Sequence, residues 1–136
     1  MPIPADLCAE LADILGGSGQ TKNGICTVEI PRTDLSVTIN GVPSKAASIH
    51  SVTFERTNGR ALMTGDLVLL QDEVPNFVLQ LLNRGIIVSA VHNHWILDDP
   101  HLIYVHVQST ADPRSFATRL AEVLATLNCA TDNVTT

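Results

Sequence analysis

The sequence predicts a single α+β domain in which helices pack on one largely antiparallel sheet. Short β-type runs separated by turn residues fill much of the first half, and amphipathic helical patterns frame and divide the chain. A length of 136 residues is enough for one hydrophobic core and too short for two ordinary domains. The expected order is α-β-β-β-β-α-β-β-α, so the C-terminal half reads β-α-β-β-α. The domain spans residues 1–136, with residues 1–5 and 129–136 loose at its ends.

The first half contains one helix and four strands. Apolar residues at helical spacing between residues 7 and 15 predict a helix, which the Gly16–Gly17 pair ends. The glycine-rich and polar residues that follow, up to Gly24, are expected to be flexible. Strands are predicted at residues 25–30, 35–40, 49–56 and 61–70. The Asn58–Gly59 pair between the last two is the strongest hairpin signal in the chain.

The second half begins with a helix that carries an apolar stripe over residues 74–82. Asp72 can cap its start, and Gly85 ends it. A strand at 86–92, a loop at 93–101, a strand at 102–108 and a helix from Asp112 to residue 127 complete the domain. Because a helix joins strands 61–70 and 86–92, these two strands are expected to run parallel, with their C-terminal ends at the same edge of the sheet.

Composition limits the partners. The formal net charge is −6 and the basic residues are scattered, so the chain does not suit nucleic acid. No stretch is long enough to cross a bilayer, and the N-terminus lacks the pattern of a secretory signal. Cys8, Cys26 and Cys129 are far apart and odd in number, which indicates neither a disulfide framework nor a thiolate zinc site. We therefore expect a cytoplasmic protein in which Cys8 is a core residue. Its expected partner is a small-molecule ligand or substrate, and a homodimer remains an open alternative.

The run VHNHW points to a site, because it places His92 and His94 one residue apart at the end of a predicted strand. Side chains alternate along a strand, so Ile86, Val88, Ala90, His92 and His94 are expected to share one face. If the following hairpin is centred near Asp99, then His106 lies directly across from His92. Glu73, in the first turn of the helix after the parallel strand, reaches the same edge. Three imidazoles and one carboxylate therefore converge from three segments.

Three neutral imidazoles and a carboxylate suit a divalent metal ion, zinc above all, with Fe, Mn, Ni and Cu also compatible. Glu73 is either the fourth ligand or the catalytic general base, and Asn93 points to the opposite face. A metal-bound water would be acidic enough near neutral pH to support hydrolysis or isomerisation of a substrate.

Each candidate also has a structural interpretation, which stays open. His92 and His94 are explained as polar residues that leave a strand, His106 as a hydrogen-bonded core histidine, and Glu73 as a favourable charge at a helix N-terminus. Asp66 is expected to cap or pair locally, for example with Arg32. His50 and His101 are expected not to be ligands, and Trp95 either walls a pocket or covers the hairpin. The HNH nucleases are excluded, because their named residues are dispersed over a ββα-metal element rather than contiguous.

The segments TGDLVLLQDEV, RGIIVSAVHNH and YVHV, together with PRTDLSVTINGVP, resemble the LppY/LpqO family, which is named for mycobacterial lipoproteins. The resemblance extends from about Ile25 to Leu127. It implies that the most characteristic positions are Asp66, Glu73, His92, His94 and His106. The chain departs from the family pattern at Trp95, at His101 and at Val107–Gln108, which implies a different ligand. The family brings no settled activity.

Three functions follow from these patterns. The first is a metal-dependent enzyme, a hydrolase or lyase, that acts on a small organic substrate. The second is a metal-binding or sensing protein without catalysis. The third is a metal-free module whose histidines hydrogen-bond a small ligand.

Overall fold

The main element of the structure, a computed structural model, is a six-stranded sheet with three helices on one face. The backbone is described for residues 2–135 and the side chains for residues 2–127. The helices are α1 (Ala5–Leu15), α2 (Val74–Asn83) and α3 (Pro113–Thr135). The strands are β1 (Ser18–Lys22), β2 (Ile25–Pro31), β3 (Val37–Ile39), β4 (Val42–Ser44), β5 (Ile49–Thr57), β6 (Arg60–Leu70), β7 (Ile87–His92), β8 (Asp98–Asp99) and β9 (Leu102–Ser109). Short 3₁₀ turns, η1 (Ala46–Ser48) and η2 (Gln71–Glu73), precede β5 and α2.

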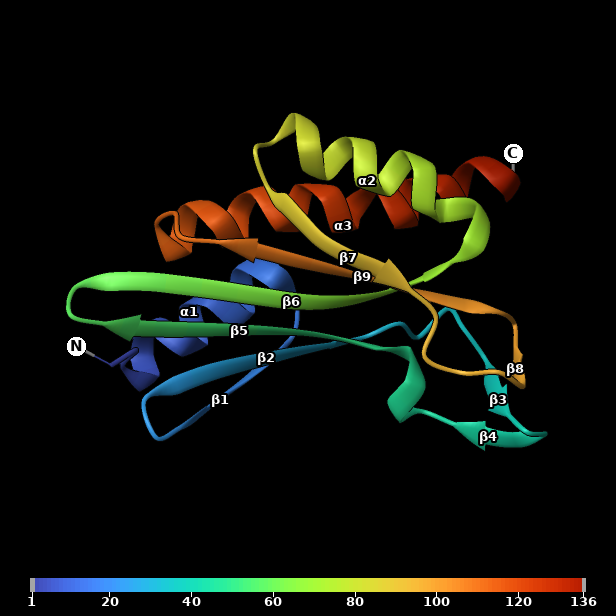
Figure 1. Ribbon diagram of the computed structural model, residues 1–136, viewed down its shortest axis with the longest axis horizontal. Coiled ribbons are helices and arrows are strands. Elements are labelled where there is room, and N and C mark those ends of the chain that lie inside the picture. Colours follow the sequence, from blue (N-terminus) through green and yellow to red (C-terminus); the bar gives the residue numbers. More distant parts are fainter. Residues whose placement is uncertain (1, 136) are drawn as a thin grey trace.

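The large sheet has the order β1-β2-β5-β6-β9-β7, and the small sheet has the order β4-β3-β8. Every neighbouring pair is antiparallel, which confirms the predicted α+β class. β6 and β7 both lie antiparallel to β9, so they run parallel to each other as predicted. They are not neighbours, however, because β9 lies between them (Figure 1).

Three Asn-Gly pairs close the hairpins of the first half. Asn23–Gly24, Asn40–Gly41 and Asn58–Gly59 all have positive φ at both residues, as the tight hairpin turn with two left-handed residues requires. The sequence analysis predicts a hairpin only at the third pair. The first pair turns the expected flexible stretch into strand β1, and the second creates β4 after β3. The prediction of flexibility at residues 16–24 is therefore wrong.

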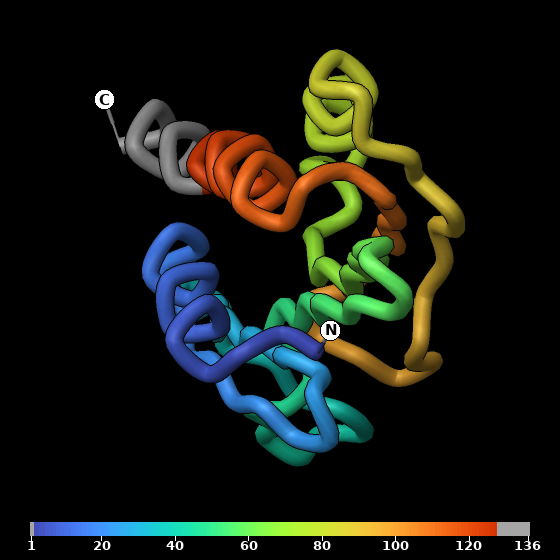
Figure 2. The backbone as a smooth tube through the Cα atoms, turned by 90° about the vertical axis from the view of Figure 1, so that its left-hand side faces the viewer, coloured from blue at the N-terminus to red at the C-terminus, as the bar shows by residue number. Residues whose placement is uncertain are grey.

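The main core lies between the helices and one face of the large sheet. Its largest fully buried side chains include Phe54, Phe77, Phe116 and Leu120. A second, smaller core on the opposite face contains Val37, Ala47, Val68, Leu102 and Tyr104, next to the small sheet. Figure 2 shows α1 and α3 on one side of the strands, with the β7 edge on the far side. The rest of that second face is open, and we refer to it below as the open face.

The N-terminal residues are better ordered than expected. Ile3 is buried, and its N–H donates to the Gly24 carbonyl at 3.1 Å, so the first residues are not loose. The backbone of α3 continues beyond the expected end at residue 127. The side chains after Leu127, expected to form a loose tail, lie outside the described side chains.

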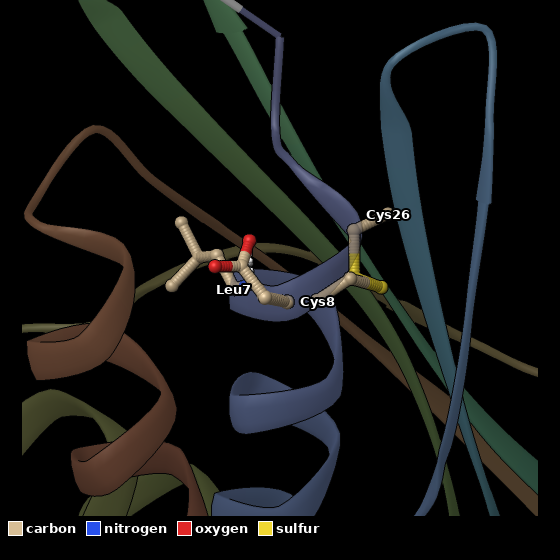
Figure 3. Close-up of a disulfide and its surroundings, with 4 residues drawn as sticks. Leu7, Cys8 and Cys26 are labelled. Atoms are coloured by element: carbon tan, nitrogen blue, oxygen red, sulfur yellow. Dashed lines mark hydrogen bonds between the residues drawn. A yellow bond between two sulfur atoms is a disulfide. The ribbon is translucent and has the colours of Figure 1, made fainter.

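Cys8 and Cys26 form a disulfide, and the expectation of unpaired cysteines is wrong for these two residues. The bond joins α1 to β2, and both cysteines are buried (Figure 3). The sequence separation of 18 conceals how close the two residues lie, because α1 packs directly across the β1–β2 hairpin. Gly19 permits this approach, since a Cβ there would lie 3.1 Å from Cys8 Sγ.

A buried network around Arg32 and His50 binds the end of β6 beyond the point where its pairing with β5 stops. The β5–β6 pairing ends at Ser51 and Asp66, so Val68 has no strand partner on that side. Its N–H donates to His50 Nδ1 at 3.1 Å, and its carbonyl accepts a bond from Arg32 Nη1 at 3.3 Å. Arg32 is buried and also donates to both carboxylate oxygens of Glu73 and of Asp34. His50 and Arg32 thus provide hydrogen-bond partners for the N–H and the carbonyl of Val68. Buried backbone groups require such partners.

His50 is fixed in its neutral form by this arrangement. Burial lowers its pKa from 6.5 to about 3, and the Arg32 cation adds to the shift while Asp34 opposes it. Since Nδ1 accepts the Val68 N–H, the ring proton lies on Nε2. The unfolded chain takes up a proton below pH 6.5 that the folded chain refuses until about pH 3.

We predict that His50 makes the fold less stable as the pH falls from 6.5 towards 3. The slope from this one residue is about 1.4 kcal/mol per pH unit. Asn at position 50 keeps an acceptor for the Val68 N–H and does not titrate. Denaturant unfolding of metal-free protein at pH 7.5 and pH 5 should show the wild type losing about 2 kcal/mol more than His50→Asn. Equal losses in the two proteins would show that His50 titrates normally.

Candidate metal centre

His92, His94 and His106 come together on the open face. Each offers one ring nitrogen, and these three atoms lie within 4.8 Å of one another. The ring centroids are 4.7 Å apart for His92 and His106, and 5.1 Å apart for His92 and His94. His92 and His94 are exposed and His106 is half-buried, so the group is open to solvent on one side. The predicted convergence of the three imidazoles is confirmed.

The register between β7 and β9 differs from the predicted one. His92 lies opposite Tyr104, and His106 lies opposite Ala90. His106 is therefore a diagonal neighbour of His92 rather than its direct partner. The contact survives because diagonal neighbours on one face remain within reach of long or aromatic side chains.

A β-bulge at Ser89 decides which face the histidines occupy. Val88 pairs with Val107 and Ala90 pairs with His106, so Ser89 is an extra residue with no partner in β9. Val88 packs on the main core under the helices, whereas Ala90 and His92 lie on the open face. The prediction that Val88 and His92 share a face is thus wrong. In a regular strand both would face the core, and the extra residue reverses the alternation.

Hydrogen bonding indicates which nitrogen is free in two of the three rings. His92 Nδ1 lies 3.1 Å from the Asn93 carbonyl oxygen, which can only accept, so Nδ1 carries the proton and Nε2 is left as the acceptor. His106 Nε2 is buried and has no hydrogen-bond partner. A buried polar atom without a partner is costly in a folded protein, and an ion that binds it removes the cost.

Tyr104 supports the ring of His94. The two rings stack with centroids 3.7 Å apart and planes 7° apart. Trp95 Nε1 donates to Tyr104 Oη at 3.0 Å, and Tyr104 Oη donates to the Ala47 carbonyl at 2.5 Å. Desolvation lowers the pKa of His94, Asp66 opposes the shift, and His92 and His106 add to it. The ring is therefore kept neutral, which is the form that binds metal.

The carboxylate of Asp66 lies beside the three-histidine group. It lies opposite His106 in the β6–β9 pairing, and its Oδ1 is 3.7 Å from His106 Nδ1. That oxygen is buried and, like His106 Nε2, has no hydrogen-bond partner. The expected local pairing of Asp66 with Arg32 is not present among the ion pairs of the described side chains.

Glu73, expected as a fourth ligand or general base, is placed elsewhere. Its Oε1 accepts bonds from Arg32 Nη1 at 2.6 Å and from the Leu70 N–H at 2.8 Å. Its Oε2 accepts a bond from Arg32 Nη2 at 3.0 Å. Glu73 is not part of the group of ligand atoms that contains the three imidazoles. Because β9 separates β6 from β7, the carboxylate that follows β6 meets the end of β2 instead.

The other residues near the motif have structural roles. Asn93 Nδ2 donates to the Trp95 carbonyl at 3.1 Å and so shapes the loop that carries His94. His101 Nδ1 lies 2.9 Å from Asp98 Oδ1, and His50 belongs to the buried Arg32 network. Neither His50 nor His101 joins the three-histidine group, as expected.

Sequence reasoning missed Tyr104 and the bulge. Tyr104 was visible as the residue two before His106 on the same strand, and period-two alternation places both on one face. The bulge had no comparable signal. Ser89 interrupts an apolar run, but a polar residue at that position fits a regular strand equally well.

Comparison with known proteins gives a family and no activity. No helix in the described part of the chain is long and apolar enough to span a membrane. No match was found among curated proteins or among solved structures. A family model described as Domain of Unknown Function (DUF1259) matches residues 9–126, which include all three histidines and Asp66. The chain therefore belongs to the family of DUF1259 domains.

Proposed function

We propose that this domain binds one divalent metal ion through His92, His94 and His106, with zinc as the first choice. The observation that carries the proposal is the convergence of three ring nitrogens within 4.8 Å. In addition, His106 Nε2 is buried and has no hydrogen-bond partner. Three imidazoles are a common ligand set of catalytic zinc, and Fe, Mn, Ni and Cu also accept nitrogen ligands. The resemblance to the LppY/LpqO pattern supports the same three residues.

The spacing of the three ring nitrogens is compatible with a zinc ion. Zinc holds nitrogen ligands at about 2.0–2.1 Å, so the ligand atoms around a tetrahedral ion lie about 3.4 Å apart. His92 and His94 are exposed and the latter follows the end of β7, so small side-chain rotations are enough to close the group. His106, inside β9, is the fixed member.

We assign Asp66 the supporting role that was expected of Glu73. A carboxylate beside the non-ligating nitrogen of a histidine fixes the ring orientation and raises its basicity. Asp66 is positioned for this at His106 Nδ1, and the free Nε2 of His106 then faces the ion. Glu73 is fully engaged by Arg32 and the Leu70 N–H, so we leave it out of the metal centre.

A metal-dependent enzyme, a hydrolase or lyase on a small organic substrate, is the function that we favour. Three protein ligands leave a coordination position open, and the exposure of His92 and His94 directs it towards solvent. A bound metal there would supply an activated water or polarise a substrate oxygen. His92, His94 and His106 hold the ion, and the Tyr104 stack keeps His94 in place.

A metal-binding or sensing protein without catalysis is the second candidate. The location of the histidines on the exposed face of a sheet favours it, because substrates are usually enclosed in a concave site. A metal-free ligand-binding module is the third candidate. It has no explanation for the buried, unpartnered Nε2 of His106.

We predict that the dialysed protein binds one zinc ion per chain. His92→Ala and His106→Ala should each weaken binding at least 100-fold, because two imidazoles do not hold zinc as three do. Calorimetric titration gives affinity and stoichiometry. His101→Ala is the matched control and should bind like the wild type, since His101 pairs with Asp98 outside the group. Absence of saturable binding by the wild type would refute the metal centre.

Asp66→Asn should lower zinc affinity about 10- to 100-fold without changing the ligand set. The visible spectrum of the cobalt-substituted protein reports the ligand set independently of affinity. We expect the spectrum of the variant to match that of the wild type, as it does for a residue that positions a ligand. Glu55 lies on β5 and on the same face of the sheet as Asp66. The variant Glu55→Gln is therefore the control and should leave the zinc affinity unchanged. A changed cobalt spectrum would make Asp66 a ligand, and unchanged affinity would remove it from the centre.

Deletion of Ser89 should preserve metal binding if Ser89 is a bulge, whereas in a regular strand the deletion would move His92 to the other face. Without the extra residue, Val88 still pairs with Val107 and His92 still lies opposite Tyr104. Insertion of one Ala after Val91 should abolish binding, because it moves His92 to the other face. Zinc titration of both variants, with folding checked by circular dichroism, gives the comparison. Loss of binding on deletion of Ser89 would mean that β7 is regular.

A further inference from the structure

Strand β7 forms one edge of the large sheet, and no strand of residues 2–135 lies on its outer side. Figure 2 shows this segment along the outer margin of the molecule, with α2 at its upper end. The exposed large apolar side chains concentrate here. Of the ten in the described part of the chain, seven lie between residues 79 and 97: Leu79, Leu82, Ile87, Val91, Trp95, Ile96 and Leu97.

An edge strand of this composition is unusual. Free edges are normally protected by Lys, Pro or inward-pointing charges, because their backbone groups otherwise pair with another chain. Residues 87–92 read IVSAVH and contain none of these. Ile87 is 55% exposed and Val91 46% exposed, one towards each face of the sheet. A free strand edge of this kind can pair with a second extended strand.

We propose that the neighbour is β7 of a second copy of this chain, paired antiparallel about a two-fold axis. Such a pairing joins two six-stranded sheets into one continuous sheet. The inference does not depend on the metal centre, because it rests on the backbone edge and the apolar side chains beside it.

The face pattern of β7 favours a self-pairing that includes the whole strand. Directly opposed residues of antiparallel strands share a face. When Ile87 lies opposite His92 of the other copy, both residues are on the open face. Val88 then lies opposite Val91 of the other copy, and both are on the helix face. The bulge at Ser89 creates this match, because regular alternation would put Ile87 and His92 on different faces.

Helix α2 adds exposed apolar side chains next to the β7 edge, on the face of the sheet that the helices cover. Leu79 is 53% exposed and Leu82 57% exposed, and α2 packs beside β7. The two-fold axis would bring these side chains near their counterparts, next to Val91 of both copies. Residues 85–97 carry no Asp, Glu, Lys or Arg, so a second copy meets no charge repulsion along the strand.

The pairing would place two metal centres on one continuous face. Five residue steps of about 3.3 Å separate the two His92 side chains by about 17 Å along the strands. Ile87 of one copy would then lie beside His92 of the other. Each centre would therefore have an apolar wall that the single chain does not supply.

Sedimentation velocity on the full chain tests the proposal. The wild type should sediment as a dimer of twice the 14.6 kDa chain mass, and Val91→Lys and Ile87→Lys should sediment as monomers. Val42→Lys changes an apolar residue on β4 that is 64% exposed, and this variant should remain dimeric. Circular dichroism confirms that each variant is folded.

A monomeric wild type at tens of micromolar would overturn the proposal, and so would a dimer that both lysine variants leave intact. A zinc titration of the same samples separates this result from the metal centre. Zinc binding by a monomeric wild type refutes the dimer alone, and a dimer without zinc binding refutes the metal centre alone.

Discussion

The face on which His92 lies depends on how β7 accommodates one extra residue, Ser89, as a bulge. His92 lies four positions after Val88, and in a regular strand that even spacing puts both under the helices. Ser89 has no partner in β9, so the alternation reverses and His92 reaches the open face beside His106. The bulge therefore lets one short strand contribute Val88 to the core and His92 to the candidate centre. A bulge next to a functional site is a recurrent way to re-aim a side chain.

The two faces of the large sheet carry different parts of the structure. One face is filled by helices and carries the main core, fastened at α1 by the Cys8–Cys26 disulfide. The other face carries the histidines, Asp66 and the smaller core around Tyr104. The buried Arg32 network lies at the end of β6 and satisfies the edge of Val68. Because this network engages both carboxylate oxygens of Glu73, we propose Asp66 instead as the carboxylate that supports the candidate centre.

The sequence was sufficient for most of the fold. Helical spacing located α1, α2 and α3, and β-type runs located β2, β3, β5, β6, β7 and β9. The short strand β8 lies in the segment that was expected to be a loop. It was also sufficient for the three histidines, because the β-α-β connection and the hairpin after it bring their segments together. β1 and β4 were missed although Asn23–Gly24 and Asn40–Gly41 carry the same turn signal as Asn58–Gly59. The remaining errors concern long-range geometry. Neither the insertion of β9 between β6 and β7, nor the bulge, nor the Cys8–Cys26 contact is encoded in local spacing.

The ligand set of the bound metal tests the central claim most directly. X-ray absorption at the zinc edge of the loaded protein reports the number and type of ligand atoms. We expect three imidazole nitrogens at about 2.0–2.1 Å, completed by oxygen and without sulfur. A spectrum with one imidazole or none, or with sulfur ligands, would contradict a centre built from His92, His94 and His106.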